Sequence, residues 1–200
     1  MIKVKICGLK RDCDIEYANQ LKPDYVGFVF ADYSSRFISP ELAVVMRCKL
    51  STEINAVGVI VNLPLQKAAR IVGDSLMDLV QLHGDEDDNY ILRLRELTGK
   101  PIIKAFRVDS ESDLSRAASS SADYVLFDSG SGGTGKTFDW SLIAQIERPY
   151  FLAGGLNPQN VETAVEKLHP YAVDTSSGVE TGGHKDFQKI KSFIDIIRGK

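Results

Sequence analysis

The sequence predicts an α/β protein that forms one (β/α)8 barrel, or TIM barrel, as a single domain over residues 1–200. Short apolar segments rich in Val, Ile, Phe and Tyr alternate eight times with amphipathic segments of helical period. The repeat is about as long as one strand, one helix and two short loops, and no linker or low-complexity segment interrupts it. Strands separated by helices run parallel, and eight such units can close into a barrel. An open doubly wound sheet is the alternative, but it usually needs fewer strands.

The predicted strands are short apolar runs that end in polar residues or glycine. In chain order they are Ile2–Cys7, Tyr25–Phe30, Ala56–Val61, Leu79–His83, Ile102–Phe106, Tyr124–Asp128, Tyr150–Ala153 and Ala172–Thr175. The helices predicted between and after them are Asp12–Leu21, Pro40–Cys48, Pro64–Val72, Glu86–Leu97, Glu111–Ser119, Asp139–Ile146, Pro158–Lys167 and Asp186–Ile197.

Proline and aspartate mark several of these helix starts. Pro40, Pro64 and Pro158 are each expected at a first helical position, where the missing N–H of proline costs nothing. Asp186 is expected to be the N-cap of the last helix.

Composition and charge exclude several classes of protein. The chain is 44% hydrophobic and 26% charged, with a net charge of −3, so no overall basic field favours nucleic acid as a partner. The first residues are charged and lack a long apolar core, which argues against a signal peptide or a membrane span. Cys7, Cys13 and Cys48 are few, odd in number and irregularly spaced, as expected of free thiols in the cytoplasm. No spacing of Cys and His is typical of a metal site.

Polar residues and glycines collect at the carboxyl ends of the predicted strands, where barrel enzymes carry their active sites. Loops at the opposite ends resemble ordinary surface turns, so we interpret the first set as a site. Its candidate residues are Cys7, Arg36, His83, Asp128, Gly154, Gly155, Asp174, Ser176, Ser177 and Gly178.

Two segments are candidates for holding a phosphate. The string GSGGTGKT at Gly130–Thr137 matches the nucleotide-binding pattern G-x-x-x-x-G-K-[ST]. It lies in the sixth repeat, however, and Asp139 predicts only a short helix after it. TIM barrels more often bind phosphate with the loops after strands seven and eight. Small residues there, Gly154-Gly155 and Ser176–Gly178, let backbone N–H groups approach an anion closely.

Six segments together resemble the phosphoribosylanthranilate isomerase family over almost the whole chain, from residue 3 to about 186. They are Lys5–Leu9, Ser35–Pro40, Val80–Asp85, Gly132–Trp140, Leu152–Leu156 and Asp174–Glu180. The resemblance implies a cytoplasmic (β/α)8 enzyme of tryptophan biosynthesis, a monomer or homodimer that converts a phosphorylated aminoaldose into an aminoketose without cofactor or metal.

The resemblance also implies the roles of the site residues. Cys7 would be the general base and Asp128 the general acid, with Arg36 at the anthranilate moiety and His83 and Asp174 lining the site. The glycines and serines of units seven and eight, Gly154, Gly155, Ser176, Ser177 and Gly178, would hold the phosphate.

The chemistry sets requirements on the acid and the base. A carboxylic acid needs burial or a nearby anion to keep its proton near neutral pH, and a thiol needs a nearby cation to become a thiolate. Strand alternation places Lys5 and Cys7 on one face, so we expect Lys5 to favour the Cys7 thiolate.

Three functions therefore stay open from the residues: the aminoaldose isomerase, another phosphosugar enzyme such as an epimerase or an indole-forming synthase, and a nucleotide-binding module that uses Gly130–Thr137.

Overall fold

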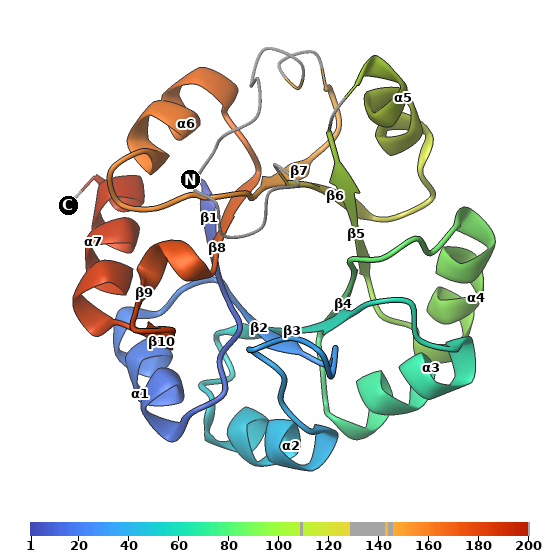
Figure 1. Ribbon diagram of the computed structural model, residues 1–200, viewed down its shortest axis with the longest axis horizontal. Coiled ribbons are helices and arrows are strands. Elements are labelled where there is room, and N and C mark those ends of the chain that lie inside the picture. Colours follow the sequence, from blue (N-terminus) through green and yellow to red (C-terminus); the bar gives the residue numbers. More distant parts are fainter. Residues whose placement is uncertain (109, 129–142, 144–145, 200) are drawn as a thin grey trace.

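Eight parallel strands close into a barrel, and helices surround it, as Figure 1 shows along the barrel axis. The computed structural model describes residues 1–108, 110–128, 143 and 146–199. Each strand pairs with its neighbours in chain order, and β8 pairs with β1 to close the ring. This closed order confirms the predicted (β/α)8 fold and excludes the open doubly wound sheet.

The barrel strands lie close to their predicted positions. They are β1 Lys3–Cys7, β2 Tyr25–Val29, β3 Asn55–Ile60, β4 Leu79–Leu82, β5 Ile102–Arg107, β6 Tyr124–Asp128, β7 Tyr150–Leu152 and β8 Ala172–Thr175. The helices are α1 Asp12–Leu21, α2 Pro40–Lys49, α3 Leu65–Asp74, α4 Asp88–Thr98, α5 Glu111–Ser119, α6 Val161–Leu168 and α7 Phe187–Arg198. The helix predicted at Asp139–Ile146 and the Gly130–Thr137 string lie outside the described residues, apart from Ile143 and Ile146.

Two of the predicted helix starts are confirmed. Pro40 is the first residue of α2, and the hydroxyl of Ser39 accepts a hydrogen bond from the N–H of Leu42. The carboxylate of Asp186 caps α7 by accepting from two backbone N–H groups.

Two other predicted starts are wrong. Pro64 is the N-cap of α3 rather than its first residue. Helix α6 begins at Val161 instead of Pro158, because Asn157 and Asn160 form a turn in which the Asn160 side chain accepts from the Asn157 N–H. Asparagine side chains compete in this way with helical backbone bonds.

The inside of the barrel is apolar towards one end and polar towards the other. Tyr25, Val57, Leu79, Ile103, Leu126, Phe151 and Ala172 form a buried cluster within the ring. The tyrosine packs edge-on against the phenylalanine across the barrel, with ring centroids 5.5 Å apart. This layer fills the interior of the barrel. The polar side chains nearer the carboxyl ends of the strands therefore pack above a layer of apolar side chains.

Three short elements after β8 were not predicted. A 3₁₀ turn, η2 Ser177–Val179, leads into a hairpin of β9 Glu180–Thr181 and β10 His184–Lys185, which lies beside α1 and α7 (Figure 1). Gly182 and Gly183 form its turn with positive φ angles of 58° and 76°, a backbone conformation that favours glycine. The Gly-Gly pair was the only local signal for this hairpin.

Among the residues described, no helix is long and apolar enough to span a membrane.

Candidate active site

One cavity of about 440 Å³ opens at the carboxyl ends of the strands and is lined by every predicted site residue. These are Cys7, Arg36, His83, Asp128, Gly154, Gly155, Asp174, Ser176, Ser177 and Gly178. A neighbouring hollow beside β4, β5 and α5 shares Val61, His83 and Asp128 with it, but neither Cys7 nor the β7 and β8 loops line that hollow. The structure therefore brings the predicted acid, base and phosphate loops together around one space.

Cys7 is the last residue of β1, and its thiol is buried against the backbone of β2. A Cβ atom at Gly27, the paired position on β2, would lie 2.6 Å from the Cys7 sulfur. Glycine at this position therefore makes room for the thiol. Burial raises the pKa of Cys7, while the positive charges of Lys5 and Lys185 oppose that effect.

Lys5 and Asp174 form an ion pair beneath Cys7. The Lys5 Nζ donates to Asp174 Oδ2 at 2.8 Å, and the lysine side chain is completely buried. Burial opposes its charge, but Asp174 and Cys7 outweigh burial and raise the pKa of Lys5. Lys5 therefore favours the Cys7 thiolate as predicted, although burial has the larger effect on the thiol.

The Asp174 side chain lines the cavity, and its second oxygen, Oδ1, is not bonded to Lys5. Its Oδ1 is buried and accepts no hydrogen bond from the residues described. Burial raises the pKa of Asp174, the ammonium of Lys5 lowers it, and the Asp128 carboxylate raises it. A negative charge on Asp128 therefore disfavours a negative charge on Asp174.

A chain of polar contacts crosses from β4 to β6. The Gln81 Nε2 lies 2.9 Å from His83 Nδ1, and the other ring nitrogen, Nε2, lies 3.4 Å from Asp128 Oδ2. Where the Gln81 amide donates to Nδ1, the ring proton lies on Nε2 and faces the Asp128 carboxylate. Gln81 is only 1% exposed and was not predicted as a site residue. The sequence does place Gln81 two residues before His83 and therefore on the same face of the strand, which could have marked it as a site residue.

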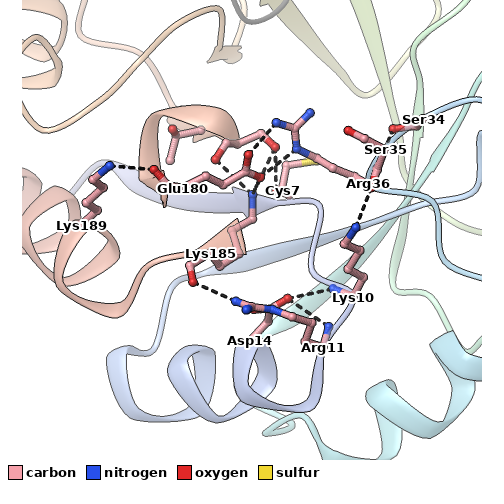
Figure 2. A network of polar contacts seen from close by, with 12 residues as sticks. Cys7, Lys10, Arg11, Asp14, Ser34, Ser35, Arg36, Glu180, Lys185 and Lys189 are labelled. Atoms are coloured by element: carbon pink, nitrogen blue, oxygen red, sulfur yellow. Dashed lines mark hydrogen bonds and ion pairs between the residues drawn. The ribbon is translucent and has the colours of Figure 1, made fainter. Parts of the chain in front are cut away.

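Arg36 reaches the cavity from the loop after β2 and is held by Glu180, as Figure 2 shows. Its Nε donates to Glu180 Oε1 and its Nη2 to Oε2, both at 2.8 Å. Lys185 Nζ donates to the same carboxylate at 2.6 Å. Burial opposes the charge of Glu180, but these two cations outweigh it and lower its pKa to about 2. Sequence reasoning did not assign a role to Glu180 or to Lys185.

The loops after β7 and β8 are built of residues with little or no side chain. Gly154 and Gly155 have positive φ angles of 86° and 69°. A Cβ at Gly178 would lie 1.9 Å from the Leu156 carbonyl oxygen, so only glycine fits where the two loops meet. The Ser176 hydroxyl donates to the carbonyl of Cys7 at 2.9 Å and joins this region to β1. Backbone N–H groups at such loops are suited to binding an anion.

Comparison with known proteins identifies the family. The family model for N-(5′-phosphoribosyl)anthranilate isomerase matches residues 4–196. An isomerase of this name from Endomicrobium trichonymphae is 49% identical over 202 residues, covering 99% of both chains. The chain belongs to the phosphoribosylanthranilate isomerase family. A second relative of that name, from Thermoanaerobacter pseudethanolicus, is also 49% identical and covers 100% of this chain and 99% of its own.

Solved structures of phosphoribosylanthranilate isomerases have the same fold. The Thermotoga maritima enzyme is 39% identical, with a TM-score of 0.91 and full coverage of both chains. Another isomerase structure, 38% identical with a TM-score of 0.88 and full coverage of both chains, is a complex with reduced 1-(o-carboxyphenylamino)-1-deoxyribulose 5-phosphate. The chain is thus an aldose–ketose isomerase of tryptophan biosynthesis. The family match spans Gly130–Thr137, so that string belongs to an isomerase rather than to a nucleotide-binding module.

Proposed function

We propose that this cavity binds N-(5′-phosphoribosyl)anthranilate and that Cys7 and Asp128 are its general base and general acid. The observation that carries this proposal is their placement. Cys7 ends β1 and Asp128 ends β6, and both side chains line one cavity. A sugar chain held between them has an acid on one side and a base on the other.

Two proton transfers by these residues lead to an enolamine, and the reaction is completed when the enolamine gains a proton at C1′ and loses the proton of its C2′ hydroxyl. Asp128 donates its proton to the ring oxygen of the ribose, so that the C1′–O bond breaks and a Schiff base forms. The Cys7 thiolate then removes the proton from C2′, which gives an enolamine that tautomerises to the ketone. The reaction moves hydrogen within one molecule, so it requires no external oxidant or reductant.

His83 and Asp174 support the acid in this proposal. The His83 Nε2–H faces the Asp128 carboxyl group and stabilises the carboxylate that remains after proton donation. Asp174 lines the cavity, where its carboxylate can accept a hydrogen bond from a substrate hydroxyl. The described residues hold no group of three or more His, Cys, Asp or Glu placed to bind a metal ion.

The two anionic ends of the substrate bind at separate places. The phosphate is held by Gly154, Gly155, Ser176, Ser177 and Gly178, whose small side chains let the backbone reach its oxygens. The carboxylate of anthranilate is bound by Arg36, whose planar guanidinium matches a carboxylate and can stack on an aromatic ring. The product analogue bound to the related isomerase carries both of these anionic groups.

Further proposals concern the protein in the cell. We propose that the chain acts in the cytoplasm as a monomer or a homodimer and needs no nucleic-acid or membrane partner. One solved relative, from T. maritima, is described as a dimeric isomerase.

An activity assay on the purified chain tests the proposed substrate. Phosphoribosylanthranilate is fluorescent, and its fluorescence should disappear on addition of enzyme without metal or nucleotide. Magnesium-dependent binding of a nucleotide together with stable substrate fluorescence would contradict the proposal and restore the alternative suggested by Gly130–Thr137.

Replacing Arg36 with alanine should mainly weaken substrate binding. Loss of a charge-assisted bond to a carboxylate costs about 1.5–3 kcal/mol, which corresponds to a rise in KM of roughly 10- to 150-fold. The Michaelis constant, measured alongside kcat, checks this expectation. An unchanged KM would show that Arg36 does not bind the substrate.

A further inference from the structure

The Arg36 guanidinium has two edges that can each bind a carboxylate, and Glu180 takes one of them. The occupied edge consists of Nε and Nη2, whose bonds to Glu180 form a bidentate pair (Figure 2). The second edge consists of Nη1 and the other hydrogen of Nη2. No described residue accepts a hydrogen bond from Nη1. Arg36 lines the cavity, whereas Glu180 does not.

Glu180 is itself fixed by buried contacts. Its side chain is 9% exposed, and that of Lys185 is 1% exposed. Lys185 Nζ also donates to the Ser176 carbonyl at 3.0 Å, next to the phosphate loop. The hairpin therefore attaches the carboxylate to the barrel rather than leaving it on a flexible loop.

The stem of Arg36 is fixed from the other side by Gly8. A Cβ at Gly8 would lie 2.5 Å from the Arg36 Cδ, and its φ of 84° also favours glycine. The side chain therefore lies directly on the backbone that follows β1 and Cys7. With its stem on Gly8 and one edge on Glu180, Arg36 has little freedom to rotate.

We infer that Glu180 is a positioning residue that occupies one edge of Arg36 and leaves the Nη1 edge to bind the carboxylate of the substrate. The inference rests on the proposed function. Arg36, Lys185 and Glu180 together carry one net positive charge, which suits a single carboxylate on the ligand. Glu180 thereby sets the position of the anthranilate group relative to Cys7 and Asp128, rather than supplying binding energy.

The test separates positioning from binding by using two product analogues. One is reduced 1-(o-carboxyphenylamino)-1-deoxyribulose 5-phosphate, and the other is the phenylamino analogue that lacks the carboxylate. The ratio of their dissociation constants measures what the carboxylate contributes. In Glu180→Gln we expect this ratio to stay at the wild-type value or to rise, because a negative charge is removed from beside Arg36. We expect kcat to fall about 10- to 100-fold, because a small displacement of a reacting group is enough for such a loss.

Three further variants make the outcome decisive. In Arg36→Met the ratio should fall towards one, and a retained ratio would overturn the role proposed for Arg36 whatever Glu180 does. Glu180→Asp keeps the charge that balances Arg36 and Lys185, but its shorter side chain cannot hold the same position, so kcat should fall in a folded protein. Asp14→Asn is the matched control, since Asp14 is a buried carboxylate of the same network that does not line the cavity.

Four results would overturn the inference. The first two are a wild-type kcat in Glu180→Gln or in Glu180→Asp. The third is a fall towards one, in Glu180→Gln, of the ratio between the dissociation constants of the two analogues. This result would mean that Glu180 contributes to binding of the substrate carboxylate. The fourth is an equal loss of kcat in Asp14→Asn, which would mean that any damage to this network slows turnover.

Discussion

The Asp128→Ala variant should lose most of its isomerase turnover, with kcat reduced by about 10²- to 10⁴-fold, the usual contribution of a general acid. Without this carboxyl group, the ring oxygen loses the proton donor that we propose at the end of β6, on the other side of the cavity from Cys7. Asp128→Asn is the sharper variant, because the amide oxygen can still accept a hydrogen bond from His83 but the proton is gone. Steady-state kcat and KM measured by substrate fluorescence check the expectation.

A variant of Lys136 tests whether the glycine-rich string Gly130–Thr137 is a loop of an isomerase or a nucleotide-binding loop. We expect Lys136→Ala to keep substantial isomerase activity, because no step of the proposed reaction uses that side chain. The opposite pattern, an active Asp128→Ala and an inactive Lys136→Ala, would show that the string rather than the strand end carries the chemistry. Thermal melting of both variants excludes a general loss of folding.

The positions of Cys7 and Asp128, the proposed base and acid, could be predicted from the sequence because they depend on strand order and strand ends alone. Parallel strands in a closed barrel bring their carboxyl ends together whatever the loops do. Cys7 and Asp128 are the last residues of their strands, so predicting the carboxyl end of each strand correctly was enough to place both residues. Side-chain alternation in turn placed Lys5 beside Cys7.

The contacts that tune the site could not be predicted in the same way. Arg36 and Glu180 are 144 residues apart in the chain and meet through a hairpin of two-residue strands, too short to show any periodicity. The partner of Lys5 was also missed, since its pairing with Asp174 depends on the register between β1 and β8. Sequence reasoning could name the cation near the thiol, but it could not weigh that charge against the burial of the thiol.

Replacing Cys7 with alanine should reduce kcat about as strongly as replacing Asp128, by roughly 10²- to 10⁴-fold, because the variant lacks the proposed base for the C2′ proton. Cys7→Ser should be nearly as inactive, since a serine hydroxyl ionises far less readily than a thiol. The same fluorescence assay measures both variants. Near-normal turnover in Cys7→Ala would show that another group is the base.

The pH dependence of the wild type gives this assignment a second test. Burial raises the pKa of Cys7 above its ordinary value, so only a minority of molecules carry the thiolate at neutral pH. If the thiolate is the base, kcat/KM should rise with pH until the thiol is ionised. The rate of Cys7 alkylation should follow the same curve in a Cys13→Ser, Cys48→Ser background, and bound product should protect the thiol.

The buried ion pair beneath the thiol sets where that rise in activity occurs. Lys5 lowers the pKa of Cys7 more than the Asp174 carboxylate raises it, so removing both charges should move the alkylation curve to higher pH. The double variant Lys5→Met, Asp174→Asn is preferable to Lys5→Met alone, because an unpaired buried charge costs about 3–5 kcal/mol of folding free energy. A curve that stays in place would mean that the pair stabilises the barrel without activating Cys7. A shifted curve would make Lys5 the residue that gives a buried cysteine enough thiolate to act as a base.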